Sequence, residues 1–257
     1  MSVNELIKAR LTALADKTQA AHLARFFKTG PGEYGEGDIF LGIRCPQTRS
    51  IVKEFKNHVD LEDIRILTAS KYHEIRLAGF LLLIEIYKKL KKRNDTDSLR
   101  LITDYYLSII ERGNNWDLVD MVAPKILGDW LTYNPDQRFI LDQLAAMNNS
   151  LWHRRVGMVA NWTIIRNHEF DDTFRIAEKL MHDPHDLIHK ASGWMLRETG
   201  KHGGKDELLA FLDRHATVMP RTMLRYAIEH FPKQEREHYL GLRAKLRFTS
   251  QPKENRP

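Results

Sequence analysis

The stretches HEIRLAGF (73–80), WHRRVGMV (152–159) and HDLIHKASGW (185–194) repeat one pattern, and that pattern decides the predicted fold. In each stretch a basic residue stands three positions before a glycine, which gives the pairs Arg76/Gly79, Arg154/Gly157 and Lys190/Gly193. The glycines are separated by 78 and 36 residues, close to two repeats and then one repeat. Such a period is typical of stacked pairs of antiparallel helices. A glycine would let two of these helices approach closely.

Apolar residues recur with helical spacing along nearly the whole chain, and no segment reads as a convincing strand. Short connectors rich in glycine, proline and asparagine separate the helical segments. We expect helices at 3–27, 46–57, 61–69, 72–93, 96–111, 116–132, 136–147, 151–166, 171–181, 185–199, 205–214, 220–230 and 233–246. The prediction is an all-α fold of HEAT-like helical repeats that form a curved α–α superhelix. It has a single domain over 1–247 and a disordered tail over 248–257.

The composition is that of a soluble protein with a modest basic excess. The 257 residues include 40 Lys and Arg against 34 Asp and Glu, a net charge of +6. This excess fits a nucleic-acid partner, although many proteins without one share it. Cys45 is the single cysteine, so no intrachain disulfide can form and a reducing compartment is expected. The sequence lacks an apolar run of roughly 18 residues and a secretory signal. We therefore expect a cytoplasmic protein with no membrane contact.

Trp116, Arg155 and Trp194 are equally spaced, 39 residues apart. In a stack with this repeat length, equal spacing places the three side chains at one register on successive repeats, where they form a row. With helix axes about 8–10 Å apart, the row would be roughly 16–20 Å long. That length suits a nucleic-acid backbone better than a small molecule. Asp120 stands four residues after Trp116 and shares its helix face.

The same residues also have a structural interpretation. In it both tryptophans belong to the core, and Arg155 is the solvated partner of an acid. Carboxylates that follow the expected helix cap Asn115 would favour the positive end of the helix dipole. We accept this role for Asp117. It is a weaker explanation for Asp120, which lies at the edge of the dipole's reach.

Hydrolysis of the N-glycosidic bond to a cationic, alkylated purine matches this set of side chains. Alkylation at ring nitrogen 3 or 7 makes the base positive, so that it departs neutral and needs no protonation. What remains is positive charge on the deoxyribose, which the carboxylate of Asp120 would stabilise while it orients water. Indole faces add to this stabilisation. Arg155 would hold a phosphate and thereby bring the sugar to the acid. This chemistry uses neither a metal nor a cofactor.

Four blocks are similar to the AlkD family of bacterial DNA-alkylation-repair glycosylases, which are built from HEAT-like repeats. The blocks are FLGIRCPQTR (40–49), WDLVDMVAPKILGDW (116–130), LWHRRVGMV (151–159) and HKASGWMLRE (189–198), and the similarity covers nearly the whole chain. The resemblance implies a metal-independent, monofunctional glycosylase acting on alkylated double-stranded DNA. It would excise 3-methyladenine and 7-methylguanine and leave an abasic site, without flipping the base into a deep pocket. We expect a monomer, as is common among repair enzymes of this size, associated with the nucleoid through DNA.

The resemblance also implies a role for particular residues. By position, Asp120 matches the catalytic acid, and Trp116 and Trp194 match the aromatic pair that cradles the damaged nucleotide. Arg155 matches the arginine that grips a phosphate.

Further basic residues are candidates for DNA contact. Arg197 would join the backbone contacts, and Arg44 stands where some relatives have a neutral polar residue, which concerns the detail of lesion contact. Other basic residues either extend a basic track or have a solvated or structural role; these are Arg76, Arg154, Lys190, Arg221 and Arg225.

Other candidate sites are weaker. A metal site at His182, His185 and His189 would need further ligands, and Pro184 interrupts the helix between the first two. Cys45 has no evident base partner and is expected to be a buried thiol. The glycine-rich segment 28–38 lacks the lysine of a phosphate-binding loop, so we expect a surface loop.

Two functions follow from the sequence. One is the glycosylase, and the alternative is a non-catalytic HEAT-repeat module that binds DNA or a protein. They differ at Asp120: the module should tolerate Asp120→Asn, whereas the enzyme should lose base release and still bind DNA.

Overall fold

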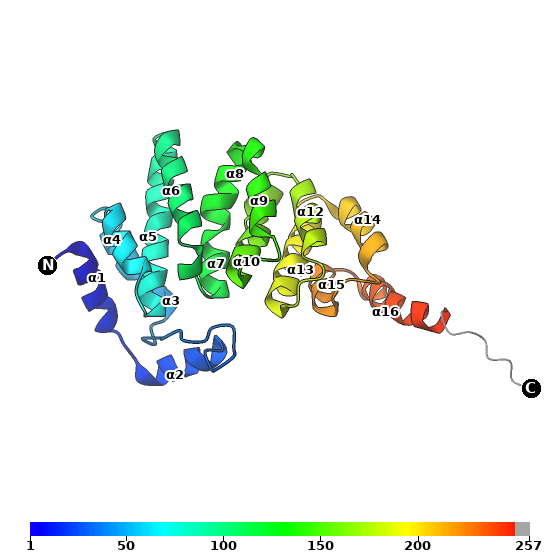
Figure 1. Ribbon diagram of the computed structural model, residues 1–257, viewed down its shortest axis with the longest axis horizontal. Helices are drawn as coiled ribbons and strands as arrows, with labels where there is room; N and C mark the ends of the chain where they lie inside the picture. The colour runs from blue at the N-terminus through cyan, green and yellow to red at the C-terminus, as the bar shows by residue number, and fades with distance from the viewer. Residues whose placement is uncertain (250–257) are drawn as a thin grey trace, which may run out of the picture. The chain divides into compact units, whose positions relative to one another are not determined.

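The computed structural model describes residues 1–249 and confirms the all-α fold over this range (Figure 1). Its one strand-like feature is an isolated parallel bridge between Ile39 and Tyr72. The contacts group into two compact units, unit 1 from Met1 to Trp130 and unit 2 from Leu131 onward. The single domain over 1–247 and the superhelical stack stay predictions. Of the predicted disordered tail, residues 250–257 lie outside the described residues.

Unit 1 is built from short and medium helices with one long central helix, α5. Its α-helices are α1 (Val3–Thr12), α2 (Lys17–Phe26), α3 (Cys45–Phe55), α4 (Leu61–Thr68), α5 (His73–Lys92), α6 (Thr96–Ser108) and α7 (Trp116–Val122). A 3₁₀ turn (Ile110–Arg112) precedes α7, and a π-helical segment (Pro124–Gly128) follows it. Helix α8 (Asp129–Tyr133) crosses the boundary between the units.

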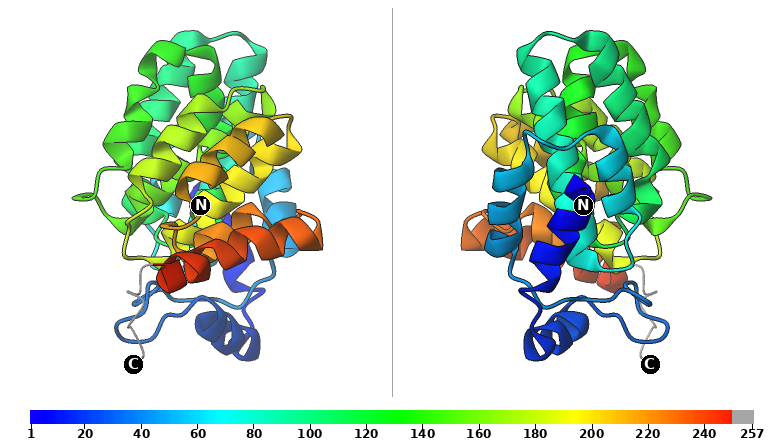
Figure 2. Two further views of the ribbon diagram at one scale, coloured as in Figure 1. Left: turned by 90° about the vertical axis from the view of Figure 1, so that its right-hand side faces the viewer. Right: turned by 90° about the vertical axis from the view of Figure 1, so that its left-hand side faces the viewer.

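Unit 2 contains α9 (Phe139–Leu144), α10 (Leu151–Val159), α11 (Asn161–Arg166), α12 (Asp171–Lys179), α13 (Asp186–Lys201), α14 (Lys205–His215), α15 (Arg221–Ala227) and α16 (Lys233–Thr249). A 3₁₀ turn (Pro135–Gln137) precedes α9. Helix α13 is its centre, because α10, α12, α14 and α15 all pack against it. Figure 2 (left) shows the later helices of this unit, from α13 onward, in yellow, orange and red.

The core of unit 1 forms around α5, whose first three turns are buried on every side. Helices α3 and α4 both pack against α5, and α1 packs against both of them. Figure 2 (right) shows α1 between these two helices. A helix that is apolar around its circumference is stable only when it is enclosed in this way.

The three pattern glycines have the packing role that the sequence predicts. A Cβ atom on Gly79 would lie 2.8 Å from Thr68 of α4, and one on Gly157 would lie 3.0 Å from the Leu141 carbonyl of α9. Gly193 is tightest, because a Cβ atom there would lie 2.4 Å from the backbone oxygen of Met223 in α15. Each glycine therefore marks a close approach of two helices.

The predicted helix over 3–27 is wrong in one respect, because the chain breaks it into α1 and α2. Asp16 begins the second helix: its Oδ1 accepts hydrogen bonds from the backbone N–H groups of Thr18 (2.8 Å) and Gln19 (3.0 Å). Its own N–H donates to the Leu41 carbonyl (2.9 Å). An N-cap residue has non-helical backbone angles, so a single helix cannot continue through Asp16.

The predicted helix over 116–132 is likewise interrupted. At the π-helical segment the N–H of Gly128 donates to the carbonyl of Ala123 (2.9 Å), five residues back instead of four. Such wide turns are rare within helices and are often found at functional sites.

No helix within residues 1–249 is both long enough and apolar enough to cross a bilayer.

Candidate functional site

Helix α7 carries two of the predicted site residues of unit 1. Trp116 is its first residue, and Asp120 follows one helical turn later on the same face. Both side chains are half-buried. Asn115 caps the helix, as the sequence predicts, because its side-chain oxygen accepts from the Trp116 N–H (2.9 Å). The pair is therefore enclosed on one side and accessible on the other.

The Trp116 indole is held by residues from the segment that follows α2. Its Nε1 donates a hydrogen bond to the Tyr34 hydroxyl (3.3 Å). Phe27 lies against the indole with 5.3 Å between ring centroids, and Phe26 contacts it edge-on at 6.0 Å. Phe27 also stacks on Phe40 at 5.1 Å. Tyr34 comes from the segment 28–38, expected to be a surface loop, so this loop contributes one of the groups that hold the indole.

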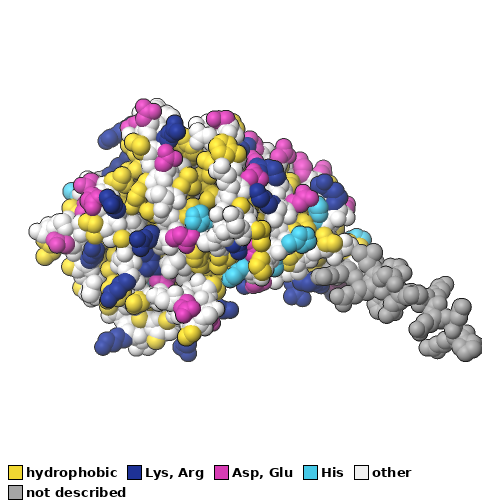
Figure 3. All heavy atoms as spheres, viewed as in Figure 1, with side chains coloured by type: hydrophobic (Ala, Val, Ile, Leu, Met, Phe, Trp, Pro, Cys, Tyr) yellow, Lys and Arg dark blue, Asp and Glu magenta, His cyan; other side chains and the backbone are white. Residues whose placement is uncertain are grey.

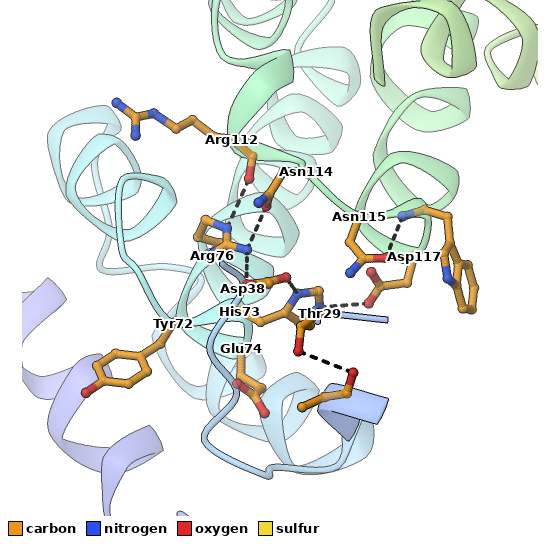
Figure 4. A network of polar contacts seen from close by, with 12 residues as sticks. Thr29, Asp38, Tyr72, His73, Glu74, Arg76, Arg112, Asn114, Asn115 and Asp117 are labelled. Atoms are coloured by element: carbon orange, nitrogen blue, oxygen red, sulfur yellow. Dashed lines mark hydrogen bonds and ion pairs between the residues drawn. The ribbon is translucent and has the colours of Figure 1, made fainter. Parts of the chain in front are cut away.

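A buried ionic network lies directly beneath this aromatic cluster. His73 begins α5 and stands between two carboxylates, Asp38 at 2.8 Å from Nδ1 and Asp117 at 2.9 Å from Nε2 (Figure 4). Arg76 reaches the other oxygen of Asp38 at 2.7 Å and the Asn114 side chain at 2.8 Å. The network ties the end of the glycine-rich segment to the starts of α5 and α7.

Charge compensation keeps this network ionised. Burial alone would lower the pKa of His73, but the hydrogen bonds and charges of Asp117 and Asp38 raise it to about 9. Burial likewise raises the pKa of Asp38, yet His73 and Arg76 lower it by more. At neutral pH the imidazolium therefore donates from both ring nitrogens.

Glu74 fixes the backbone beside the network. Its carboxylate is buried and accepts hydrogen bonds from three consecutive N–H groups, those of Leu41 (2.8 Å), Gly42 (2.8 Å) and Ile43 (3.1 Å). Gly42 has a φ of +87°, and a Cβ atom there would lie 2.0 Å from the Asp16 carbonyl. Only glycine fits this position, so the block 40–49 is held against the start of α2.

Asp120 lies near the buried phenol of Tyr106 on α6. The pKa of Tyr106 is raised, first by burial and then by the negative charge of Asp120. A raised phenol pKa keeps Tyr106 neutral and protonated. Asp120 is thus half-buried and close enough to the buried Tyr106 of α6 for its charge to act on the phenol.

Unit 2 contains the other two members of the predicted row. Trp194 lies on α13 and is half-buried, directly after the close-packed Gly193. Arg155 lies on α10, is 4% exposed, and donates a guanidinium hydrogen bond to the backbone carbonyl of Leu187 on α13. The structure thus brings Arg155 to the start of the helix that carries Trp194. Its phosphate contact stays a prediction.

The arginine of the repeated pattern has a structural role in each unit. Arg154 is 8% exposed and pairs with the buried Asp183, with 2.6 Å from Nε to Oδ2. A second guanidinium N–H donates to the Asn149 carbonyl. Arg76 makes the equivalent pair with Asp38 and donates to the Ser70 carbonyl (3.1 Å). Of the two roles left open by the sequence for Arg154, the structure shows the buried ion pair, and we expect this pair rather than a DNA contact to be its main role.

The remaining basic candidates differ in their exposure and in whether they form ion pairs with nearby carboxylates. Arg44 is exposed at the start of α3. Lys190 pairs with Asp186 one turn earlier on α13 (2.8 Å). Arg197 is half-buried and forms ion pairs with Glu229 and with Glu198, the latter at 3.3 Å. Arg44 is the candidate most open to a phosphate.

Two expectations about other side chains are corrected or refined. Cys45 is exposed, not buried, because it is the first residue of α3 and precedes Pro46 at the helix start. His185 caps α13 by accepting from the Leu187 N–H (3.1 Å), and His189 contacts the Asp183 carbonyl (2.6 Å). These two histidines thus have roles in the local structure of unit 2. Among residues 1–249, no group of three or more histidine, cysteine, aspartate or glutamate side chains is placed so that it could hold a metal ion.

Comparison with known proteins identifies the family. A family model described as "DNA alkylation repair enzyme" matches residues 7–231, most of the chain. The chain belongs to the DNA alkylation repair enzyme family. The solved structure of a "Predicted DNA alkylation repair enzyme from Enterococcus faecalis" is similar, with a TM-score of 0.66 over 85% of this chain and 97% of that chain. At 17% identity, this similarity concerns the fold. No curated protein matches the chain.

Sequence reasoning missed several residues that shape the site of this alkylation repair enzyme. His73 and Tyr34 contact the start of α7 from segments far away in sequence, and Asp38 holds the other side of the His73 ring. Asp117 was assigned to the helix dipole alone, but it also accepts the His73 hydrogen bond. One signal was available: a histidine and a glutamate open the apolar helix α5, where polar residues must find partners.

Proposed function

We propose that the protein is a DNA glycosylase that hydrolyses the N-glycosidic bond of cationic alkylated purines, such as 3-methyladenine and 7-methylguanine, in duplex DNA. One observation carries the proposal: Asp120 and Trp116, both half-buried, share one face of α7, whose start is fixed by the His73 network. Membership in the DNA alkylation repair enzyme family supports the substrate class. We propose that it acts as a monomer in the cytoplasm.

In the proposed reaction the bond between C1′ and the base nitrogen breaks, and its electron pair neutralises the cationic base. The base therefore leaves without a general acid. Positive charge that develops at C1′ and the ring oxygen is stabilised by the Asp120 carboxylate and by the Trp116 indole face. Water then attacks C1′ and gives its proton to Asp120, which returns it to solvent. The products are the free base and an abasic site, with no metal and no covalent intermediate.

The residues of unit 2 are proposed to bind the DNA. Trp194 offers a second indole surface to the damaged nucleotide, and Arg155 holds a backbone phosphate. The hydrogen bond from Arg155 to the Leu187 carbonyl restricts its guanidinium, so little conformational entropy would be lost on binding. Exposed Arg44 and half-buried Arg197 and Lys190 are proposed as further backbone contacts.

The test is an incubation of the protein in excess with a methylated duplex and no added metal, followed by chromatography for free bases. We expect release of 3-methyladenine and 7-methylguanine. A duplex that contains uracil or hypoxanthine should release nothing, because those bases carry no positive charge and their departure requires activation of the leaving group. Absence of methylpurine release at any enzyme excess would leave the non-catalytic binding module as the better description.

A further inference from the structure

A small basic cavity lies in unit 1, apart from the pair on α7. It has a volume of about 170 Å³ and opens among α3, α5 and the π-helical segment. Its polar lining consists of five cations and one carboxylate, namely Arg49, Lys53, Lys56, Lys88, Lys125 and Glu85. Apolar side chains, among them Leu81 and Ile84, form the remaining wall. The lining of the cavity thus carries a clear excess of positive charge.

The single carboxylate compensates two of the cations. Glu85 pairs with Lys88 at 2.8 Å and with Lys56 at 3.3 Å. Arg49 instead donates to two sulfur atoms, Cys45 Sγ (3.3 Å) and Met121 Sδ (3.7 Å), which are weak acceptors. Lys53 and Lys125 have no carboxylate partner within residues 1–249. Three positive charges are therefore left for an external anion.

The cations crowd one another enough to perturb a lysine. The pKa of Lys125 is lowered, first by burial of its ammonium group and then by the charges of Arg49 and Lys88. Repulsion of this kind is relieved when an anion enters. By contrast, Figure 3 shows basic side chains interspersed with acidic ones on the face of unit 1 that it displays.

The size and chemistry of the cavity select a compact anion. Pockets for small organic ligands commonly have volumes of about 300–1,000 Å³, so about 170 Å³ is small for a nucleoside or cofactor. Lysine ammonium groups and an arginine are the side chains that proteins use for phosphate. A phosphodiester fits both the size and the charge.

We propose that this cavity binds one phosphate of a DNA backbone through Lys53, Lys125 and Arg49, and so anchors unit 1 on the duplex. The inference depends on DNA being the partner of this repair enzyme and not on the glycosidic chemistry proposed above. It therefore concerns undamaged and alkylated duplexes equally. Phosphate contacts fix the position of a protein on DNA without reading its sequence.

The first test measures the affinity for an undamaged duplex by fluorescence anisotropy over a range of salt concentrations. In the variant Lys53→Gln/Lys125→Gln, the slope of log affinity against log salt should fall by about one, the contribution of one phosphate. The matched control Lys92→Gln/Arg93→Gln removes two exposed charges at the end of the same α5 region, outside the cavity. An equal loss of slope in both variants would overturn the proposal.

The second test uses a change of opposite sign. Glu85→Gln removes the competing carboxylate and frees Lys56 and Lys88, so the duplex should bind more tightly, by roughly two- to fivefold. Damage to the fold cannot produce tighter binding, so this result does not depend on the stability of the variant. Unchanged or weaker binding would contradict a phosphate site.

A third measurement separates the backbone from a free anion and uses the unmodified protein. Saturating undamaged duplex should protect Lys125 from acylation by an amine reagent, as measured by mass spectrometry, while exposed Lys92 stays reactive. Calorimetric titration with inorganic phosphate provides the second arm. If phosphate binds at Lys125 but the duplex leaves that lysine reactive, the site takes a free anion and the DNA contact is wrong. Because no alkylated base is present, failure of the glycosylase assay leaves these outcomes unaffected.

Discussion

His73 Nε2 lies 2.9 Å from Asp117 Oδ2, and this hydrogen bond joins the first turn of α5 to the first turn of α7. Asp117 directly follows Trp116, so the bond fixes the helix end that presents the indole. Because His73 is also bound to Asp38, the glycine-rich segment is fastened at the same point. The geometry of the proposed catalytic pair thus depends on a histidine that would not touch DNA.

The ionic network around His73 should make the free energy of unfolding decrease as pH rises above neutral. The pKa of His73 is raised from 6.5 to about 9, so its stabilising contribution is fully present below about pH 6.5. It is lost as pH rises through about 9 and amounts to about 3 kcal/mol. The free energy of unfolding, measured by urea titration between pH 6 and pH 10, should fall accordingly.

Substitution isolates the contribution of this histidine. His73→Gln should lower the free energy of unfolding by about 3 kcal/mol at pH 6, and the difference from the unmodified protein should shrink towards pH 10. His58→Gln, at an exposed position, is the control and should change little. Parallel pH profiles for the protein and its His73 variant would show that the network is not ionised as described.

Asp120 is expected to act in the chemical step and not in binding. Asp120→Asn should lower the single-turnover rate of methylpurine release by about 10²–10³-fold, while the affinity for the same duplex stays within about twofold. Asp104→Asn, which alters an exposed carboxylate on α6, is the control and should keep the full rate. A variant that loses binding and rate in parallel would assign Asp120 to DNA contact instead.

The adjacent arginines should separate into a structural and a binding residue. Arg154→Met leaves Asp183 buried without its partner and should cost about 3–5 kcal/mol in unfolding experiments. The salt dependence of DNA binding by the folded fraction should not change. Arg155→Met should instead reduce the salt slope by about one. If Arg154→Met alone changed the slope, the assignments would have to be exchanged.

Gly193 should be the least replaceable of the pattern glycines. Gly193→Ala places a Cβ atom 2.4 Å from the Met223 carbonyl and should separate α13 from α15, with a loss of about 1–3 kcal/mol. Gly241→Ala provides the contrast, because nothing lies within 4 Å of a Cβ atom there. In that helix interior alanine should stabilise by about 0.5–1 kcal/mol. Thermal denaturation of the two variants should shift in opposite directions.

Much of the fold could be predicted because it depends on local patterns. Helical periodicity located α5 to within one residue at each end, 72–93 against His73–Lys92. The spacing of Gly79, Gly157 and Gly193 identified three close helix contacts, because packing geometry makes glycine necessary there. The break at Asp16 was missed, since an aspartate is compatible with a helix until its side chain captures the N–H groups that follow.

Less of the candidate site could be predicted, for a different reason. The Trp116 and Asp120 pair depends only on helical spacing, and the structure gives both residues the half-buried environment that the proposed chemistry needs. Burial of Arg154 and Arg155 depends on acids and carbonyls from distant segments, such as Asp183 and Leu187. A single sequence without long-range contacts does not distinguish an arginine that faces solvent from one that closes an ion pair.

The π-helical segment at 124–128 has a consequence for the two tryptophans that flank it. Trp116 and Trp130 are two heptads apart, and an uninterrupted α-helix would return them to nearly the same azimuth, with a drift of roughly 20° per heptad. Trp130 is instead buried, while Trp116 is half-exposed. The extra residue in the wide turn rotates the following residues about the helix axis. Trp130 is thereby directed into the core, and the Trp116 indole stays accessible to a binding partner.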